Sequence, residues 1–178
     1  MHTELATFAG GCFWCTEAFF KELKGVEKVV SGYSGGKTKD PNYYEVSEGT
    51  TGHAESIQIA FDPKIIAYEQ LLEVFFFTHN PTTPDRQGND IGSQYRSVII
   101  YHDEEQKKSA EKIKQKIAEE KIYDGKIVTE IIPFMAFYPA EEYHQNYMEK
   151  NPDQPYCQFV INPKLSKFRQ KFSSFLKK

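Results

Sequence analysis

The chain has 178 residues, which is enough for one domain with a hydrophobic core, and no linker or shift in composition divides it. We expect a single domain over residues 1–178. The 22 Lys and Arg nearly balance the 25 Asp and Glu, and the net charge of -3 gives no electrostatic reason to expect nucleic acid as a partner.

The start of the chain carries neither a basic segment nor an apolar one, and no apolar run approaches the roughly 20 residues of a membrane helix. We therefore expect no membrane partner and a cytoplasmic location. The three cysteines, Cys12, Cys15 and Cys157, are too few for a secreted disulfide framework, and their number is odd. In a reducing compartment such cysteines are expected to be reactive or simply buried.

Short strands and amphipathic helices alternate along the chain. In chain order, the patterns predict a strand at 4–9, a helix at 12–24, strands at 26–36 and 53–63, a helix at about 65–78, a strand at 95–102, a helix at about 104–121 capped by Asp103, a strand at 126–134, a short helix at 140–151 and a terminal helix at 163–178. The polar segments 37–52 and 80–94 are predicted loops. Loops this long in small domains are often functional.

The order of these elements favours an α+β fold. Neighbouring strands such as 26–36 and 53–63 resemble a hairpin, which indicates a mixed or antiparallel sheet. We predict a two-layer sandwich with the helices packed on one face of the sheet, as a ferredoxin-like core with extensions. The terminal helix is expected to dock on the body through its apolar stripe, Leu165, Phe168, Phe172 and Phe175.

Two cysteines at a predicted helix start suggest thiol chemistry. The positive end of the helix dipole stabilises a thiolate, so the pKa of Cys12 is expected to fall below about 8.5. Gly10 and Gly11 leave room for a substrate beside it. Cys15 follows one turn later on the same face, close to the separation that a disulfide requires.

Two simpler explanations apply to this pair. Cys12 and Cys15 could pack a helix onto a sheet as small apolar residues. They could also supply half of a zinc site, but Cys157 belongs to no second C-x-x-C motif and no nearby pair of histidines completes four ligands. We therefore expect no metal.

Glu55 is the second unusual residue. Strict alternation over residues 53–63 places it on the apolar face of its strand with Ile57 and Ile59. Burial raises the pKa of a carboxyl group, which makes Glu55 a candidate general acid near neutral pH. The alternation alone does not distinguish this role from a buried carboxyl group that a neighbouring side chain satisfies.

Three segments carry a family resemblance: GGCFWCTEAFF at 10–20, YSGGKTKDPNYYEVSEGTTGHAESIQIAFDP at 33–63 and RQGNDIGSQYRS at 86–97. They resemble the signature segments of the A-type peptide methionine sulfoxide reductases, and the similarity extends over most of the chain. The combination is far more specific than C-x-x-C alone. The resemblance implies reduction of the S-epimer of methionine sulfoxide, free or in peptides, without a bound cofactor.

The resemblance also implies roles for individual residues. Cys12 would attack the sulfoxide sulfur and become a sulfenic acid, and Glu55 would donate a proton to the sulfoxide oxygen. Tyr43 and Tyr95 would donate hydrogen bonds to that oxygen.

Three further residues are implied to bind the substrate. Phe13 and Trp14 would hold its S-methyl group in an apolar pocket. Asp90 would contact the substrate backbone amide, although an Asp in a G-N-D turn often bonds only its own backbone.

The sequence departs from one common form of the family at Cys15, where many relatives have Gly. Cys15 is therefore the expected resolving thiol, which forms a disulfide with Cys12 that thioredoxin reopens. Cys157 lies beside an apolar stretch, and the glycine-rich tail that accompanies C-terminal recycling cysteines is absent. We expect a structural role for Cys157 and a monomeric protein.

Two other functional classes stay open at this point. A binding module could use Phe13, Trp14, Tyr43 and Tyr95 to hold oxidised peptides without turnover. A general dithiol oxidoreductase would also contain C-x-x-C, but it would leave Glu55 without a role.

Overall fold

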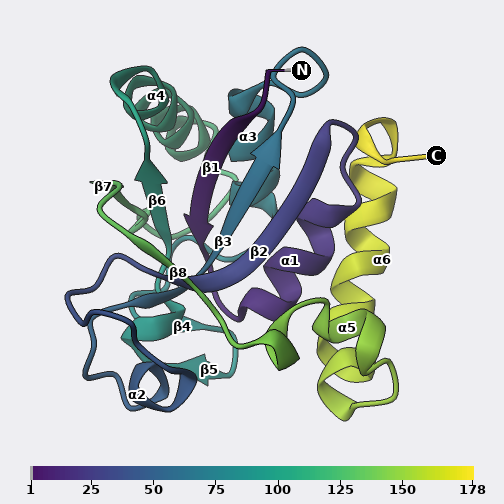
Figure 1. Ribbon diagram of the computed structural model, residues 1–178. Helices are drawn as coiled ribbons and strands as arrows, with labels where there is room; N and C mark the ends of the chain where they lie inside the picture. Colours follow the sequence, from purple (N-terminus) through teal and green to yellow (C-terminus); the bar gives the residue numbers. More distant parts are fainter. Residues whose placement is uncertain (1) are drawn as a thin grey trace.

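The computed structural model describes residues 2–178 and contains one six-stranded sheet with helices packed against it (Figure 1). The strands lie in the order β7-β6-β1-β3-β2-β8. The bounds are β1 Glu4–Ala9, β2 Val26–Ser34, β3 Ala54–Phe61, β6 Val98–Tyr101, β7 Glu130–Pro133 and β8 Phe137–Pro139. A separate two-stranded sheet pairs β4 Arg86–Gln87 with β5 Asp90–Ile91.

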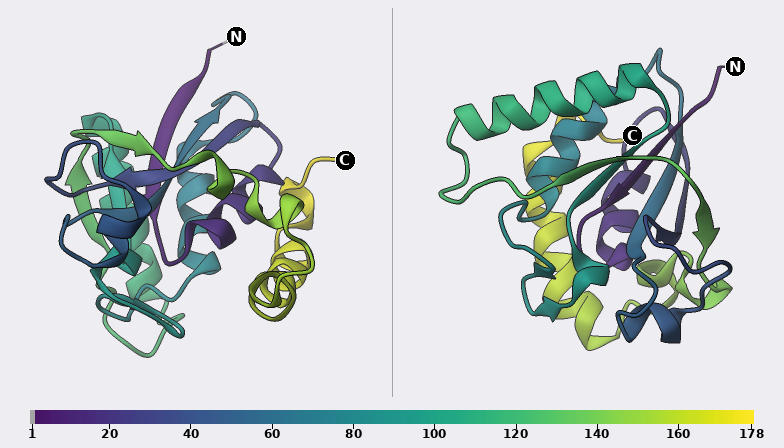
Figure 2. Two further views of the ribbon diagram at one scale, coloured as in Figure 1. Left: turned by 60° about the horizontal axis from the view of Figure 1, so that its bottom comes forward. Right: turned by 90° about the vertical axis from the view of Figure 1, so that its left-hand side faces the viewer.

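Six α-helices accompany the strands in the described residues. Their bounds are α1 Phe13–Lys21, α2 Tyr43–Ser47, α3 Tyr68–Thr78, α4 Glu104–Glu119, α5 Tyr147–Lys150 and α6 Asn162–Lys171. α4 packs against α3 (Figure 2), whereas α6 packs against α1. No helix in residues 2–178 has the length and apolar character needed to cross a membrane.

The pairing confirms the predicted fold class. β1 pairs with β3 and β6, and β2 pairs with β3 and β8, all antiparallel, whereas β6 and β7 are parallel. The sheet is therefore mixed. The chain order β1-α1-β2-β3-α3-β6 is the β-α-β-β-α-β order of a ferredoxin-like core. The remaining elements are extensions of that core.

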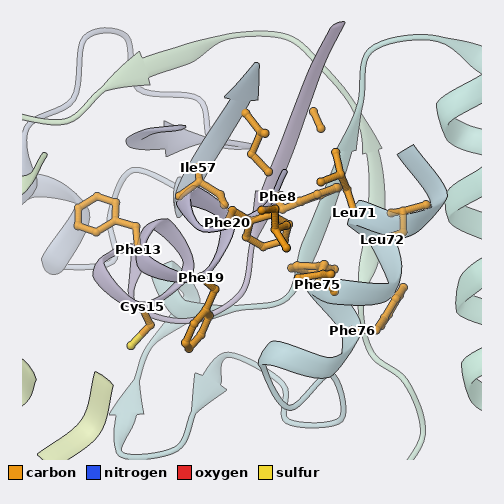
Figure 3. Close-up of a cluster of buried hydrophobic side chains, with 14 of the residues drawn as sticks. Phe8, Phe13, Cys15, Phe19, Phe20, Ile57, Leu71, Leu72, Phe75 and Phe76 are labelled. Atoms are coloured by element: carbon orange, nitrogen blue, oxygen red, sulfur yellow. The ribbon is translucent and has the colours of Figure 1, made fainter. Parts of the chain in front are cut away.

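Phenylalanine rings join the sheet to the helices on one of its faces (Figure 3). Phe8 of β1 lies 5.8 Å from the ring of Phe20 of α1 and 5.0 Å from the ring of Phe75 of α3, measured between centroids. All three side chains are fully buried. Because α1 and α3 meet the same strand residue, they cover the same face of the sheet.

The predicted loops contain structure that the sequence patterns did not reveal. Residues 37–52 include α2, which begins with a reciprocal capping box. The side chain of Asn42 accepts from the Glu45 backbone N–H at 2.9 Å, and the Glu45 carboxylate accepts from the Asn42 N–H at 3.0 Å. Residues 80–94 contain the β4–β5 hairpin and a short 3₁₀ helix, Ser93–Tyr95.

The terminal segment docks on the body as expected. Leu165, Phe168 and Phe172 are buried, and the ring of Phe168 lies 5.3 Å from that of Phe19 on α1. The helical region starts earlier than predicted, with one π-helical turn at Cys157–Ile161 that continues directly into α6. It ends at Phe172, before a 3₁₀ turn at Ser173–Phe175.

Replacing Phe8 should test the energetic importance of this aromatic contact. Phe8→Ala leaves a cavity between β1, α1 and α3, and we expect a loss of about 3–5 kcal/mol in the free energy of unfolding. Urea denaturation followed by circular dichroism measures it. Leu5→Ala, on the same strand at a position that is 42% exposed, is the matched control. An equal loss in both variants would show that the cluster is not the centre of the core.

Candidate active site

The Gly-Gly-Cys turn connects the end of β1 to the start of α1. Gly11 has a φ of +84°, and a Cβ at this position would lie 2.6 Å from Cγ of Gln87, so both backbone conformation and space require glycine. Cys12 is the N-cap of α1, with extended φ and ψ of −64° and 127°. Its carbonyl oxygen accepts from the backbone N–H of Cys15 at 3.1 Å. Cys12 therefore lies at the helix start, as predicted.

Cys12 and Cys15 form a buried pair of free thiols. Burial is the main cause that raises the pKa of Cys12 above its ordinary value, and the neighbouring Cys15 thiol adds to the shift. The nearby carboxyl group of Glu55 raises the pKa further, and the backbone N–H of Trp14 only partly opposes these effects. The helix-dipole expectation was wrong in direction. In the resting protein, Cys12 keeps its proton at neutral pH.

Glu55 is buried on β3, directly beside the start of α1. Its Oε1 accepts a hydrogen bond from the backbone N–H of Phe13 at 3.2 Å, and only 3% of the residue is exposed. Burial raises the pKa of this carboxyl group to about 8, and the negative charge of Asp90 adds to the shift. At neutral pH most Glu55 is therefore protonated, as a proton donor requires.

Two tyrosines lie close to these groups. Tyr43 begins α2 and Tyr95 ends the 3₁₀ helix at Ser93–Tyr95. Burial raises the pKa of both hydroxyls, and their electrostatic interaction with Glu55 is the second cause in each case. Cys12 contributes to both shifts as well. Both hydroxyls are therefore neutral hydrogen-bond donors within interaction range of the thiol and the carboxyl group.

Trp14 is held in an aromatic cluster that comes from the C-terminal part of the chain. Its ring stacks on Tyr147 with a centroid distance of 3.6 Å and an interplanar angle of 5°. Its Nε1–H donates to Nδ1 of His144 at 3.0 Å. Trp14 stays partly exposed, whereas Phe13 has no exposed surface. Of the two predicted methyl contacts, only Trp14 presents accessible surface, whereas Phe13 packs against Tyr33 and His144.

Asp90, on β5, is joined to the cysteine pair through Tyr156. The Tyr156 hydroxyl donates to Oδ2 of Asp90 at 2.9 Å and lies 3.8 Å from Sγ of Cys15. Asp90 thus has a partner other than its own turn backbone. The predicted contact to a substrate amide stays a prediction.

Several residues of this site were missed in the sequence. His144, Tyr147 and Tyr156 lie about 130 residues or more after Trp14, and no local pattern links them to it. His144 is buried, which lowers the pKa of its imidazole, so the neutral ring accepts from Trp14. Glu141 was also missed; it accepts from the Tyr33 hydroxyl at 3.1 Å and from the Tyr43 N–H at 3.2 Å.

Cys157 is fully buried at the first position of the π-helical turn. Burial raises the pKa of its thiol, and an electrostatic interaction with Cys15 adds to the shift. The structure is compatible with the predicted structural role, which stays a prediction. Within residues 2–178, no three His, Cys, Asp or Glu side chains gather as metal ligands would.

A buried dithiol at a helix start, beside a protonated carboxyl group and neutral tyrosines, makes this a cysteine-based redox site. The family model described as peptide methionine sulfoxide reductase matches residues 4–176. The chain is 58% identical over 169 residues to peptide methionine sulfoxide reductase MsrA of Sulfolobus acidocaldarius, covering 95% of each sequence. The chain belongs to the peptide methionine sulfoxide reductase family, as an enzyme of its MsrA type.

Solved structures agree with this assignment. Reduced Mxr1 from Saccharomyces cerevisiae has a TM-score of 0.82 and 39% identity, covering 87% of this chain and 89% of that one. Mxr1 in complex with Trx2 has a TM-score of 0.57 and 32% identity, covering 82% of this chain and 84% of that one.

The raised pKa of Glu55 predicts a pH-dependent stability. Because the folded-state pKa of about 8 exceeds the ordinary value of 4.5, the stabilising effect of the neutral carboxyl group is fully present below pH 4.5. It is lost as the pH rises through about 8. The free energy of unfolding of Glu55→Gln, minus that of the unchanged protein, should therefore increase as the pH rises from 4.5 to 8.5. Urea denaturation at several pH values measures this difference. Glu111→Gln, at an exposed position on α4, is the control. A pH-independent difference for Glu55→Gln would contradict the assignment.

Proposed function

We propose that this protein reduces the S-epimer of methionine sulfoxide, free or in proteins, to methionine, and so repairs oxidised proteins. The observation that carries the proposal is the hydrogen bond from the Phe13 backbone N–H to Glu55, which holds a protonated carboxyl group beside the Cys12 turn. Family membership supports the reaction class. The choice of epimer rests on the resemblance to the A-type enzymes.

In the first step, the Cys12 sulfur attacks the sulfoxide sulfur while Glu55 gives its proton to the sulfoxide oxygen. Because Cys12 begins as a thiol, its own proton passes to the Glu55 carboxylate that has just formed. The hydroxyl group then passes from the methionine sulfur to Cys12 as the S–O bond and the newly formed S–S bond both break, which leaves methionine and a Cys12 sulfenic acid. The methionine sulfur gains two electrons and the Cys12 sulfur loses two, so atoms, protons and electrons balance.

Tyr43 and Tyr95 support this step by donating hydrogen bonds to the oxygen as it gains negative charge. Their raised pKa values keep both hydroxyls protonated. Trp14 is proposed to contact the S-methyl group through its accessible surface, and the fully buried Phe13 is proposed to complete the apolar surroundings. Asp90 is proposed to accept from the backbone amide of a peptide substrate.

In the second step, the Cys15 thiol attacks the Cys12 sulfenic acid. A disulfide forms and the oxygen leaves as water. The placement of Cys12 at the N-cap of α1 and of Cys15 in the first turn supports this pairing, because the two residues lie one turn apart on the same helix. Cys157 is proposed to stay a buried structural thiol.

A thioredoxin-type protein is the proposed reductant that reopens the disulfide. The solved complex of Mxr1 with Trx2 supports a protein partner of this kind. The cycle needs a reduced dithiol and no bound cofactor, and a reducing compartment such as the cytoplasm maintains thiols in that state. We propose a monomer as the working unit.

A single-turnover reaction tests the proposal directly. Fully reduced protein, mixed with racemic N-acetyl methionine sulfoxide and no reductant, should release about one equivalent of methionine from the S-epimer only. Chiral chromatography of the substrate and peptide mapping of the protein measure the result. The expected product is a Cys12–Cys15 disulfide. Saturable binding without methionine release would favour a binding module instead.

Three serine variants assign the sulfur atoms. Cys12→Ser should release no methionine, because it removes the attacking sulfur. Cys15→Ser should release one equivalent and then fail to turn over with thioredoxin, whereas Cys157→Ser should turn over as the unchanged protein does. A Cys12–Cys157 disulfide in the peptide map would be consistent with the reductase activity but would contradict the resolving role of Cys15.

Glu55→Gln should slow the chemical step by about 10²–10⁴-fold, because it removes the general acid without removing the hydrogen bond from Phe13. Rapid-quench single turnovers measure the rate. In the unchanged protein this rate should fall as the pH rises through about 8, where Glu55 loses its proton. The Gln variant should lack that decline. A wild-type rate in the variant would mean that the proton comes from another group.

A further inference from the structure

A groove with a phenylalanine floor and a lysine rim lies between α1, α3 and α6. It has a volume of about 320 Å³, and its floor is formed by Phe19, Phe77, Phe168 and Phe172. Lys164, Lys167 and Lys171 form its rim, and we call the whole the lysine-rimmed groove. Its size is at the lower end of the range for ligand pockets.

No neighbouring acidic side chain in the part of the chain that the structure describes neutralises the positive charge of the rim. The three lysines follow one another along one side of the α6 segment, and none of them has an ion pair within residues 2–178. No Asp or Glu lines the groove. Nζ of Lys171 lies 3.5 Å from the ring centroid of Phe77. The groove therefore suits a surface that combines an apolar side chain with carboxylates, although the chain as a whole has a net charge of -3.

The groove adjoins the back of the Gly-Gly-Cys turn. Two residues of its wall, His79 and Gln87, contact the two glycines: a Cβ on Gly10 would lie 3.0 Å from Cγ of His79, and one on Gly11 would lie 2.6 Å from Cγ of Gln87.

Cys15 itself lies beside the groove floor. Phe19 follows one turn after Cys15 on α1, and Figure 3 shows the two side chains next to each other. The neighbouring Cys12 is the main cause that lowers the pKa of the Cys15 thiol, and the positive charge of Lys164 lowers it further. A partner seated in the groove would therefore lie next to the sulfur that a reductant must reach.

We propose that the lysine-rimmed groove is the docking surface for the protein reductant, whose apolar side chain enters the phenylalanine floor while its carboxylates meet Lys164, Lys167 and Lys171. This inference rests on the proposed function and adds a binding surface to it. The substrate is a poorer fit as occupant, because Trp14, Tyr43 and Tyr95 do not line the groove.

Docking at this place defines the first exchange step. A thiolate of the reductant attacks Sγ of Cys15, a mixed disulfide forms, and the Cys12–Cys15 bond breaks with its electron pair on Cys12, which takes up a proton. The second thiol of the reductant then attacks the reductant's sulfur in the mixed disulfide, and an intramolecular disulfide forms in the reductant. Cys15 leaves as a thiol and the reductant carries away the disulfide, so two electrons have been transferred.

A charge-reversal variant tests the docking surface. In Lys167→Glu/Lys171→Glu, the KM for thioredoxin should rise about tenfold or more, because like charges now face each other on the rim. Turnover is followed by NADPH oxidation with thioredoxin and thioredoxin reductase. Turnover with dithiothreitol and single-turnover methionine release should both stay within about twofold, because neither requires docking. The salt dependence of the thioredoxin reaction should also weaken.

Lys28→Glu/Lys64→Glu is the matched control. Both lysines are exposed, lie outside the groove and change the net charge by the same amount. This control should keep the KM for thioredoxin within about twofold.

An unchanged thioredoxin KM in the groove variant, or an equal rise in the control, would overturn the docking surface. If the groove variant instead had a higher KM for an acidic sulfoxide peptide and an unchanged KM for thioredoxin, the groove would bind the substrate. That result would also contradict the proposed docking of the reductant. If the unchanged protein releases no methionine in a single turnover, the proposed function fails, and the docking inference fails with it. Circular dichroism verifies that both double variants are folded.

Discussion

The hydrogen bond between the Phe13 backbone N–H and Glu55 is the contact on which the site depends. It joins the first turn of α1 to β3, two elements that also pack on each other through the shared core. An N–H at a helix start has no partner within the helix, so a side chain from another element can accept from it without disrupting any other bond. Glu55 supplies that acceptor and is thereby fixed beside Cys12.

Burial, more than this contact, determines which groups carry protons. A carboxylate accepting one N–H would ordinarily have a low pKa, but burial outweighs the hydrogen bond and raises the pKa of Glu55 to about 8. The same burial keeps Cys12 protonated. Cys12 and Glu55 are therefore both mainly uncharged in the resting site, and in the proposed mechanism these two groups become charged only during the transfer of the Glu55 proton. A neutral site in a buried position avoids the large cost of isolated charges.

The sequence predicted the parts of this site that depend on local pattern. Strand alternation placed Glu55 on the buried face, and the glycine turn placed Cys12 at the start of α1, because both depend only on neighbours in the chain. The fold class followed from the order of strands and helices. The capping box at Asn42 was visible in principle as N-x-x-E, but the surrounding polar residues indicated a loop.

The sequence could not predict effects that arise from distant packing. The expected fall in the pKa of Cys12 was derived from the helix start alone, whereas the observed rise comes from burial and from Glu55, 43 residues away in the chain. The His144 and Tyr147 rings that hold Trp14 come from still further away. A long-range contact between aromatic residues leaves no periodicity in either segment, so only the fold reveals it.

The two sides of the cysteine pair differ in chemistry, and this difference separates the two half-reactions. Around Cys12 lie groups that keep their protons at neutral pH, Tyr43, Tyr95 and Glu55, which suits the proposed proton transfer from Glu55 to an uncharged sulfoxide. The pKa of the Cys15 thiol is lowered, mainly by the neighbouring Cys12 and further by the positive charge of Lys164. A lower pKa makes Cys15 a better leaving group from a mixed disulfide. The asymmetry therefore favours oxygen transfer at one sulfur and release to a reductant at the other, within a single turn of α1.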